Sequence, residues 1–153
     1  MKEQDIKVFI DATAHYFAQI TRQHARIGAP YLSTHAELEY YDYSGLIGIA
    51  GKYRGCIYFS APRPLLRHLL VNMGESEHND DHLLDIVGEI ANTLSGNARK
   101  HFGSEFIISV PIAVKGKIEN VRPPSDLLPY IIPITWNAYR SSLVICVGAN
   151  ERQ

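Results

Sequence analysis

Hydrophobic and polar residues alternate along this chain with two periods, one close to a helical turn and one close to the two-residue repeat of a strand. The helical period predicts a long helix over residues 3–26, ended by Gly28-Ala29-Pro30, and a second over residues 80–102, ended by Gly103. A shorter helix is expected over residues 63–73. The apolar residues that share one side of the first helix are Phe9, Tyr16, Phe17, Ile20 and Ile27.

Strand-like runs fill the segments between these helices. Residues 31–60 are predicted as strands, and LIGIAGKYRGCIYFS within them indicates a hairpin. After the second long helix, EFIISVPIAVKGKIE predicts a long strand with Pro111 at an edge, a bend or a bulge. NVRPPSDLLP is expected to be a loop, and YIIPITWNAYRSSLVICVGA again holds two apolar runs around a polar turn.

The order of these elements repeats. A long helix, a strand and a hairpin occur twice, with the short helix between the copies. The hairpins share a Tyr-Arg pair, Tyr53-Arg54 and Tyr139-Arg140, and the triplet Asp11, His15, Ala18 has the same spacing as Asp85, Glu89, Asn92. We interpret this similarity as an internal duplication.

The second long helix has two distinct faces. At about 100° per residue, one side collects the apolar residues and is predicted to be buried. These residues are Leu83, Leu84, Val87, Ile90, Ala91, Leu94 and Ala98. A stripe within roughly 40° of Asp85 lies nearly opposite and holds Asp85, Glu89, Asn92, Gly96 and Arg99. Glu89 and Asn92 are therefore neighbours that point the same way.

This polar stripe has an unusual composition for a solvated helix face, which is the simpler interpretation. Such a face normally carries Lys, Glu, Arg and Gln, whereas this one has Asp, Asn and Gly, and each Gly costs about 1 kcal/mol relative to Ala. Gly96 lies on the stripe and Gly88 on its flank. Small residues there predict that another backbone approaches this helix closely.

A metal site is a further interpretation of the same helix. His78, His82, Asp85 and Glu89 share the stripe, and His and carboxylate ligands one turn apart hold zinc or iron in other proteins. The gap from His82 to Glu89 is two turns, so a single ion would need ligands from another element. His15, His24 and His35 are scattered along the chain, so the spacing does not favour a metal site.

Composition narrows the class of protein. The chain has 153 residues, 46% of them hydrophobic and 20% charged, which suits a single globular domain over residues 1–153. The net charge is −1 with no Lys/Arg-rich stripe, so nothing indicates binding to nucleic acid or to an anionic membrane. The N-terminal segment lacks an apolar signal core, and we expect a cytoplasmic protein. Cys56 and Cys146 lie in apolar runs and are expected to be buried free thiols.

The second long helix also resembles a known family. LLDIVGEIANTLSGNARKHFG is similar to the signature helix of the CheX family, within the CheC/CheX/FliY group of bacterial chemotaxis phosphatases. The family motif stands here as Asp85-x-x-x-Glu89-x-x-Asn92, with Gly88 and Gly96 in a similar context. The apolar strand FIISVPIAV and the order of elements resemble the family too. The first helix has His15 and Ala18 where a second working motif needs Glu and Asn, which matches relatives with one active helix.

The resemblance implies an α/β (α+β) fold, with a mostly antiparallel sheet, two long helices on one face and an internal pseudo-duplication. It implies a homodimer joined through the sheet, and a phosphatase that acts on the phospho-aspartate of a CheY-like response-regulator receiver. Catalysis is then assigned to Glu89 and Asn92, and receiver binding to Asp85, Gly88 and Gly96. No cofactor of the chain's own is expected, since the receiver supplies Mg²⁺.

The chemistry of an acyl phosphate suits these residues. Its hydrolysis mainly needs a water molecule held in line with phosphorus, and an Asn amide, which both donates and accepts hydrogen bonds, can hold it. Glu89 would pair with a receiver lysine. The alternative function is a non-catalytic receiver-binding or switch-complex adaptor, of the kind seen in relatives of FliM.

Overall fold

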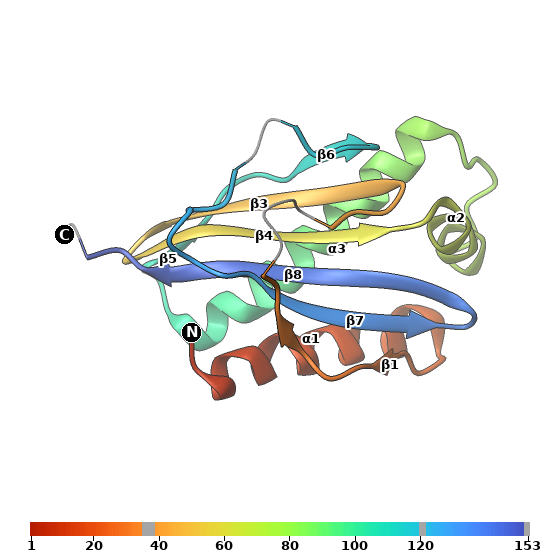
Figure 1. Ribbon diagram of the computed structural model, residues 1–153. Helices are drawn as coiled ribbons and strands as arrows, with labels where there is room; N and C mark the ends of the chain where they lie inside the picture. The colour runs from red at the N-terminus through yellow and green to blue at the C-terminus, as the bar shows by residue number, and fades with distance from the viewer. Residues whose placement is uncertain (35–38, 120–121, 152–153) are drawn as a thin grey trace.

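The computed structural model describes residues 1–34, 39–119 and 122–151. Its helices are α1 (Glu3–Thr21), α2 (Arg63–Asn72) and α3 (Asp80–Phe102). The strands of the first half are β1 (Arg26–Ile27), β2 (Tyr31–Leu32), β3 (Tyr43–Gly51) and β4 (Tyr53–Ala61). Those of the second half are β5 (Phe106–Ile108), β6 (Ile112–Lys115), β7 (Tyr130–Trp136) and β8 (Tyr139–Ala149). Figure 1 shows their arrangement.

All strands form one antiparallel sheet in the order β1-β7-β8-β4-β3-β5, with β2 beside β7 and β6 beside β3. The sheet is symmetric in its strand order. If β1, β2, β3 and β4 are taken as the equivalents of β5, β6, β7 and β8, the same order is read from either edge. The edge strands of each half pair with the hairpin of the other half, and β4 pairs with β8 at the centre. This symmetric order confirms the repeat inferred from the sequence.

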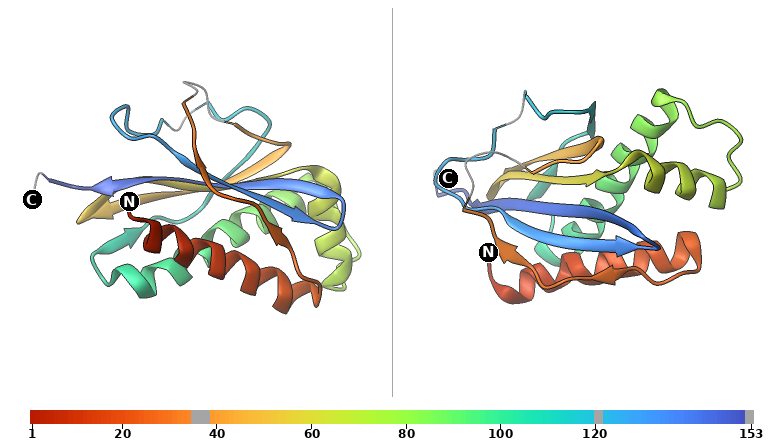
Figure 2. Two further views of the ribbon diagram at one scale, coloured as in Figure 1. Left: turned by 60° about the horizontal axis from the view of Figure 1, so that its bottom comes forward. Right: turned by 45° about the vertical axis from the view of Figure 1, so that its right-hand side comes forward.

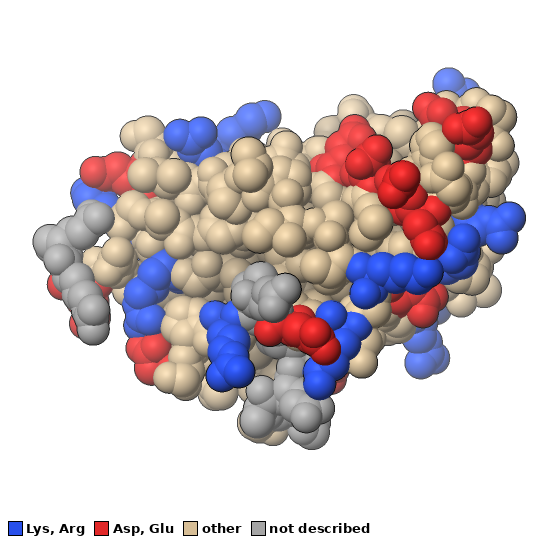
Figure 3. Space-filling model, turned by 90° about the horizontal axis from the view of Figure 1, so that it is seen from above, with Lys and Arg blue, Asp and Glu red and all other residues tan. Residues whose placement is uncertain are grey.

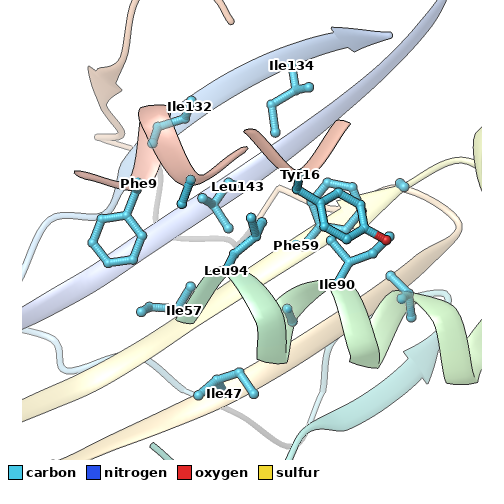
Figure 4. Packing of buried hydrophobic residues seen from close by; sticks show 14 of the residues in the cluster. Phe9, Tyr16, Ile47, Ile57, Phe59, Ile90, Leu94, Ile132, Ile134 and Leu143 are labelled. Carbon is cyan, nitrogen blue, oxygen red and sulfur yellow. The ribbon is translucent and has the colours of Figure 1, made fainter. Parts of the chain in front are cut away.

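The two long helices lie side by side on one face of the sheet, while α2 lies at one end (Figure 2). The main core fills the space between this face and the helices. Figure 4 shows Phe9 and Tyr16 of α1 and Ile90 and Leu94 of α3 meeting side chains from the strands. A smaller apolar cluster lies apart from the main core and contains Leu46, Tyr58, Ile118, Ile131 and Val144. The predicted fold class is confirmed.

The first helix is shorter than predicted. It ends at Thr21, where Arg22 adopts the left-handed conformation with φ 59°, and Ile20 is 37% exposed. Ile27 lies instead in β1, paired with Ile134 of β7. Ile20 and Ile27 therefore do not continue the buried stripe. Pairing with a distant strand stabilises this segment in a conformation that the local periodicity did not indicate.

The second long helix matches its predicted bounds. Asn79 is the N-cap, and its side chain accepts a hydrogen bond from the backbone N–H of His82, while Gly103 ends the helix at φ 96°. Asp80, in the first turn, contacts Tyr43, Arg63 and Lys115, which come from β3, α2 and β6. Hydrogen bonds from Tyr43 and Lys115 lower the pKa of Asp80 to about 2. These contacts hold the N-terminus of α3 against β3, α2 and β6.

The strand predicted over residues 105–119 is interrupted. Ile108 pairs with Ile49 and Ile112 pairs with Leu46, so residues 109–111 lie opposite only Ile47 and Gly48. This is a β-bulge with one extra residue, one of the alternatives predicted for Pro111. It divides the segment into β5 and β6.

Both cysteines are buried free thiols, as predicted. Cys56 of β4 and Cys146 of β8 are direct partners in the central ladder. Burial raises the pKa of the Cys56 thiol to about 12, so it stays protonated near neutral pH.

Candidate functional site

The polar stripe of α3 lies on the surface of the molecule, opposite the core. Asp85, Glu89, Asn92 and Arg99 are exposed and Gly96 is half-buried, whereas Leu83, Val87, Ile90, Ala91, Leu94 and Ala98 are buried. Leu84 is half-buried at the margin. The two faces predicted from periodicity are therefore present. Their positions follow from α3 packing on β3, its main neighbour in the sheet.

Glu89 and Asn92 are one helical turn apart on this surface. Among the described residues, neither the Glu89 carboxylate nor the Asn92 amide makes a hydrogen bond or an ion pair. An acceptor and a donor–acceptor group thus stand together without hydrogen-bond or ion-pair partners in the described part of the chain. Such a pair is available to a water molecule or to a group on another protein.

Acidic residues continue along the same helix towards its N-terminus. Asp81, Asp85 and Glu89 are all exposed. Figure 3 shows a row of acidic side chains over the side where the N-terminal half of α3 lies, with an uncharged area next to it. The surface around Glu89 is therefore suited to a partner that presents a cation beside apolar groups.

Gly88, which was predicted to contribute to receiver binding, packs against other parts of the chain. It is buried, and a Cβ added there would lie 3.6 Å from Cβ of Pro111 and 3.8 Å from Cβ of Ala113. On β3, a Cβ added to Gly45 would lie 2.9 Å from Cα of Gly88 and 2.8 Å from the carbonyl carbon of Val87. Gly88 therefore belongs to the closest crossing of α3 over the sheet, where Gly45 leaves room for the helix backbone.

This crossing fixes the position of the candidate site. Glu89 follows Gly88 directly and points away from the sheet, and Asn92 lies one turn further on. Sequence analysis did not identify Gly45 as part of this arrangement. A glycine in an apolar strand run is a signal of close backbone approach, and Gly45 stands directly before the apolar residues Leu46 and Ile47 in SGLIGIA.

Gly96 lies on the open stripe, as predicted, and a Cβ added there would meet no atom within 4 Å. Replacing Gly96 by alanine is therefore expected to raise the free energy of unfolding by about 1 kcal/mol, because alanine favours helix. Chemical denaturation measures this change. A loss of stability would show that the glycine is needed by the fold itself; a gain leaves contact with a partner as the reason for a glycine there.

The corresponding stripe on α1 lacks both groups. Asp11 and His15 are exposed, Ala18 is half-buried, and Asp11 pairs with Lys7 at 3.5 Å. Tyr16 is buried, and its burial followed by the charge of Glu89 raises the pKa of its phenol. The side chain of Tyr16 therefore remains neutral beside Glu89. Ala18 offers no hydrogen bond at all, so α1 does not repeat the Glu–Asn pair.

Two of the side chains considered for a metal site, His78 and His82, contact residues close to them in sequence. His78 contacts the backbone oxygen of Glu75 at 2.9 Å, and His82 contacts Glu77 at 3.3 Å and Asn79 at 2.6 Å. Within residues 1–34, 39–119 and 122–151, no three His, Cys, Asp or Glu side chains gather closely enough to hold an ion.

In the same part of the chain, no helix has the length and apolar character needed to cross a membrane.

Solved structures share this fold over nearly the whole chain. A CheC-like superfamily protein from Shewanella sp. PV-4 is 27% identical, with a TM-score of 0.83 over 97% of this chain and 100% of its own. Chemotaxis protein CheX from Vibrio vulnificus is 24% identical, with a TM-score of 0.80 over 95% and 99%. CheX of Borrelia burgdorferi, solved in complex with CheY, BeF3 and magnesium, is 18% identical, with a TM-score of 0.75 over 93% and 96%.

These similarities define the fold as that of a CheC-like chemotaxis protein. The family model described as chemotaxis phosphatase CheX matches residues 43–135, and the chain belongs to this family. The matched region contains α3 with Glu89 and Asn92, the bulge and the β3–β4 hairpin, and it ends within β7. A search among curated protein sequences gave no match.

Proposed function

We propose that the chain is a phosphatase that removes the phosphoryl group from the phospho-aspartate of a CheY-like receiver. The observation that carries this proposal is the pair of exposed side chains Glu89 and Asn92, which have no hydrogen-bond or ion-pair partner among residues 1–34, 39–119 and 122–151, on the α3 surface of a CheX-family protein. The complex of a similar CheX with CheY supports the choice of a receiver as partner.

The proposed reaction needs a water molecule more than it needs a protein nucleophile. The water oxygen bonds to phosphorus while the bond from phosphorus to the aspartyl oxygen breaks, which releases phosphate and restores the carboxylate. The Asn92 amide accepts a hydrogen bond from this water and orients it in line. Its neutral side chain performs no proton transfer, so it acts by position alone.

Glu89 has a separate proposed role. Its carboxylate pairs with a lysine of the receiver and fixes α3 over the phosphoryl group. Asp85 and Gly96 border this contact, and Gly88 supports it from beneath. The chain itself needs no metal in this scheme, because Mg²⁺ and the phosphoryl-binding groups belong to the receiver.

Phosphate release from a panel of phosphorylated CheY-like receivers tests the proposal. The panel is phosphorylated with a small acyl-phosphate donor, and release is compared with and without the protein. Faster release from at least one receiver supports the phosphatase. Binding to a receiver without faster release would instead identify the non-catalytic adaptor.

Replacing Glu89 by alanine should weaken both receiver binding and turnover, because an interfacial charge pair holds the helix in place. We expect kcat/KM to fall by at least about tenfold, measured as phosphate release against receiver concentration.

His15→Ala is the matched control for Glu89→Ala. His15 has the equivalent spacing on α1 and is likewise exposed. The variant should keep normal activity, and a large loss with an intact circular dichroism spectrum would show that both long helices take part.

We also propose that the protein is a homodimer joined through its sheet and acts in the cytoplasm, where response regulators are found. The sheet has two edges, and edge strands offer unpaired backbone groups to a second chain. Light scattering of the purified protein measures its mass, and a monomer at micromolar concentration would contradict this proposal.

A further inference from the structure

The β-bulge at residues 109–111 is built by specific hydrogen bonds. Ser109 donates its backbone N–H to the Gly48 carbonyl oxygen at 2.9 Å, and its hydroxyl accepts the Gly48 N–H at 2.8 Å. The same hydroxyl donates to the carbonyl oxygen of Val110 at 2.9 Å. The side chain of Ser109 thus takes the place of a backbone partner, and the chain leaves the ladder in a fixed conformation.

The extra residue reverses which side chains face the helices. Before the bulge, Phe106 and Ile108 pack into the main core, and after it Ala113 does so. Without the bulge, Ile112 would face α3 where the small Ala113 now contacts Gly88. The bulge therefore permits the close crossing of α3 and also places Val110 outside the ladder.

Val110 is the most exposed large apolar side chain of the described residues, at 81%. Its neighbour Pro111 lies against Gly88, and Gly88 is adjacent to Glu89 and one turn from Asn92. Val110 is therefore one residue from the point where this segment approaches α3, on the flank of the stripe. The uncharged area beside the acidic row in Figure 3 is the side on which β6 lies.

Protection of the sheet edge does not explain this side chain. Bulges and prolines protect edges, and charged residues at the edge do so as well, but an exposed valine works against that purpose. Bulges are also frequent beside active sites, where they direct a side chain outward. An apolar group held outward by an ordered bulge next to the Glu–Asn pair indicates contact with another protein.

We propose that Val110 is a docking residue for the phosphorylated receiver, entering an apolar depression beside its phosphorylation site. This inference rests on the proposed function. Because Val110 adjoins the Glu89–Asn92 surface, the partner proposed for it is the same receiver. Val110 contributes the same binding free energy in the ground state and in the transition state, because it touches no reacting atom. Loss of Val110 therefore raises KM and leaves kcat unchanged.

Val110→Ser tests the inference in steady-state phosphate release with the receiver that responds best in the panel. KM should rise about tenfold, the effect of burying one valine side chain, with kcat within about twofold. Ile107→Ser is the matched control, since Ile107 is 49% exposed on the same edge but lies on the other side of the bulge. It should leave both constants unchanged.

An unchanged KM in Val110→Ser overturns the inference, and so does an equal effect of Ile107→Ser. If the unchanged KM comes with a loss of dimer mass in Val110→Ser, Val110 belongs instead to a contact with a second copy of this chain. Affinity for a receiver bound to beryllofluoride and Mg²⁺ distinguishes failure of the docking role of Val110 from failure of the proposed phosphatase activity. If wild type binds but releases no phosphate, the phosphatase fails, and a weaker affinity of Val110→Ser still supports docking. No binding at all overturns both.

Discussion

Asn92→Ala should reduce kcat for receiver dephosphorylation by at least about 100-fold while receiver affinity stays within a few-fold. A group that positions water contributes chiefly in the transition state, and loss of alignment by about 1 Å has effects of this size. The side chain is exposed and without partners among the described residues, so its removal leaves the fold intact. Single-turnover phosphate release and affinity for the beryllofluoride-bound receiver measure the two effects separately.

Asn97→Ala provides the matched control. Asn97 is on the same helix and is half-buried, but it lies outside the stripe. It should keep normal turnover. If Asn92→Ala releases phosphate at the wild-type rate, the role given to this amide is wrong. A parallel loss of affinity would place Asn92 in docking instead.

Gly45→Ala is expected to lower the free energy of unfolding by about 3 kcal/mol. The added Cβ would lie 2.8 Å from the carbonyl carbon of Val87 and 2.9 Å from Cα of Gly88. Both atoms are backbone, so no side chain can turn away, and α3 must move off the sheet. Chemical denaturation measures the loss, and the midpoint of thermal unfolding should fall by roughly 10 °C.

Gly48→Ala, on the same strand, is the control for that prediction. A Cβ there would lie no closer than 3.5 Å to another atom, the hydroxyl oxygen of Ser109, and the position is exposed. Its stability should stay within about 0.5 kcal/mol of wild type. Equal stability of Gly45→Ala and wild type would mean that the close crossing does not fix α3. A movement of α3 in Gly45→Ala should also lower turnover, because Glu89 and Asn92 move with it.

Local pattern determined the helix that carries the candidate site. The bounds of α3 and its two faces follow from residues within a few turns of one another, and both were predicted. The same is true of the two hairpins, whose strands are adjacent in sequence. Glu89 and Asn92 could therefore be placed together on the open surface before any tertiary contact was known.

Only the tertiary structure decided how these pieces meet. The edge strands pair with the opposite half of the chain, α1 ends at Thr21 because Ile27 joins β7, and Gly88 is buried rather than part of the open surface. The bulge could be foreseen at Pro111 as one alternative, but its register and the exposure of Val110 depend on Gly48, about 60 residues earlier. These features depend on contacts between distant segments, which a periodicity measured over a few residues does not contain.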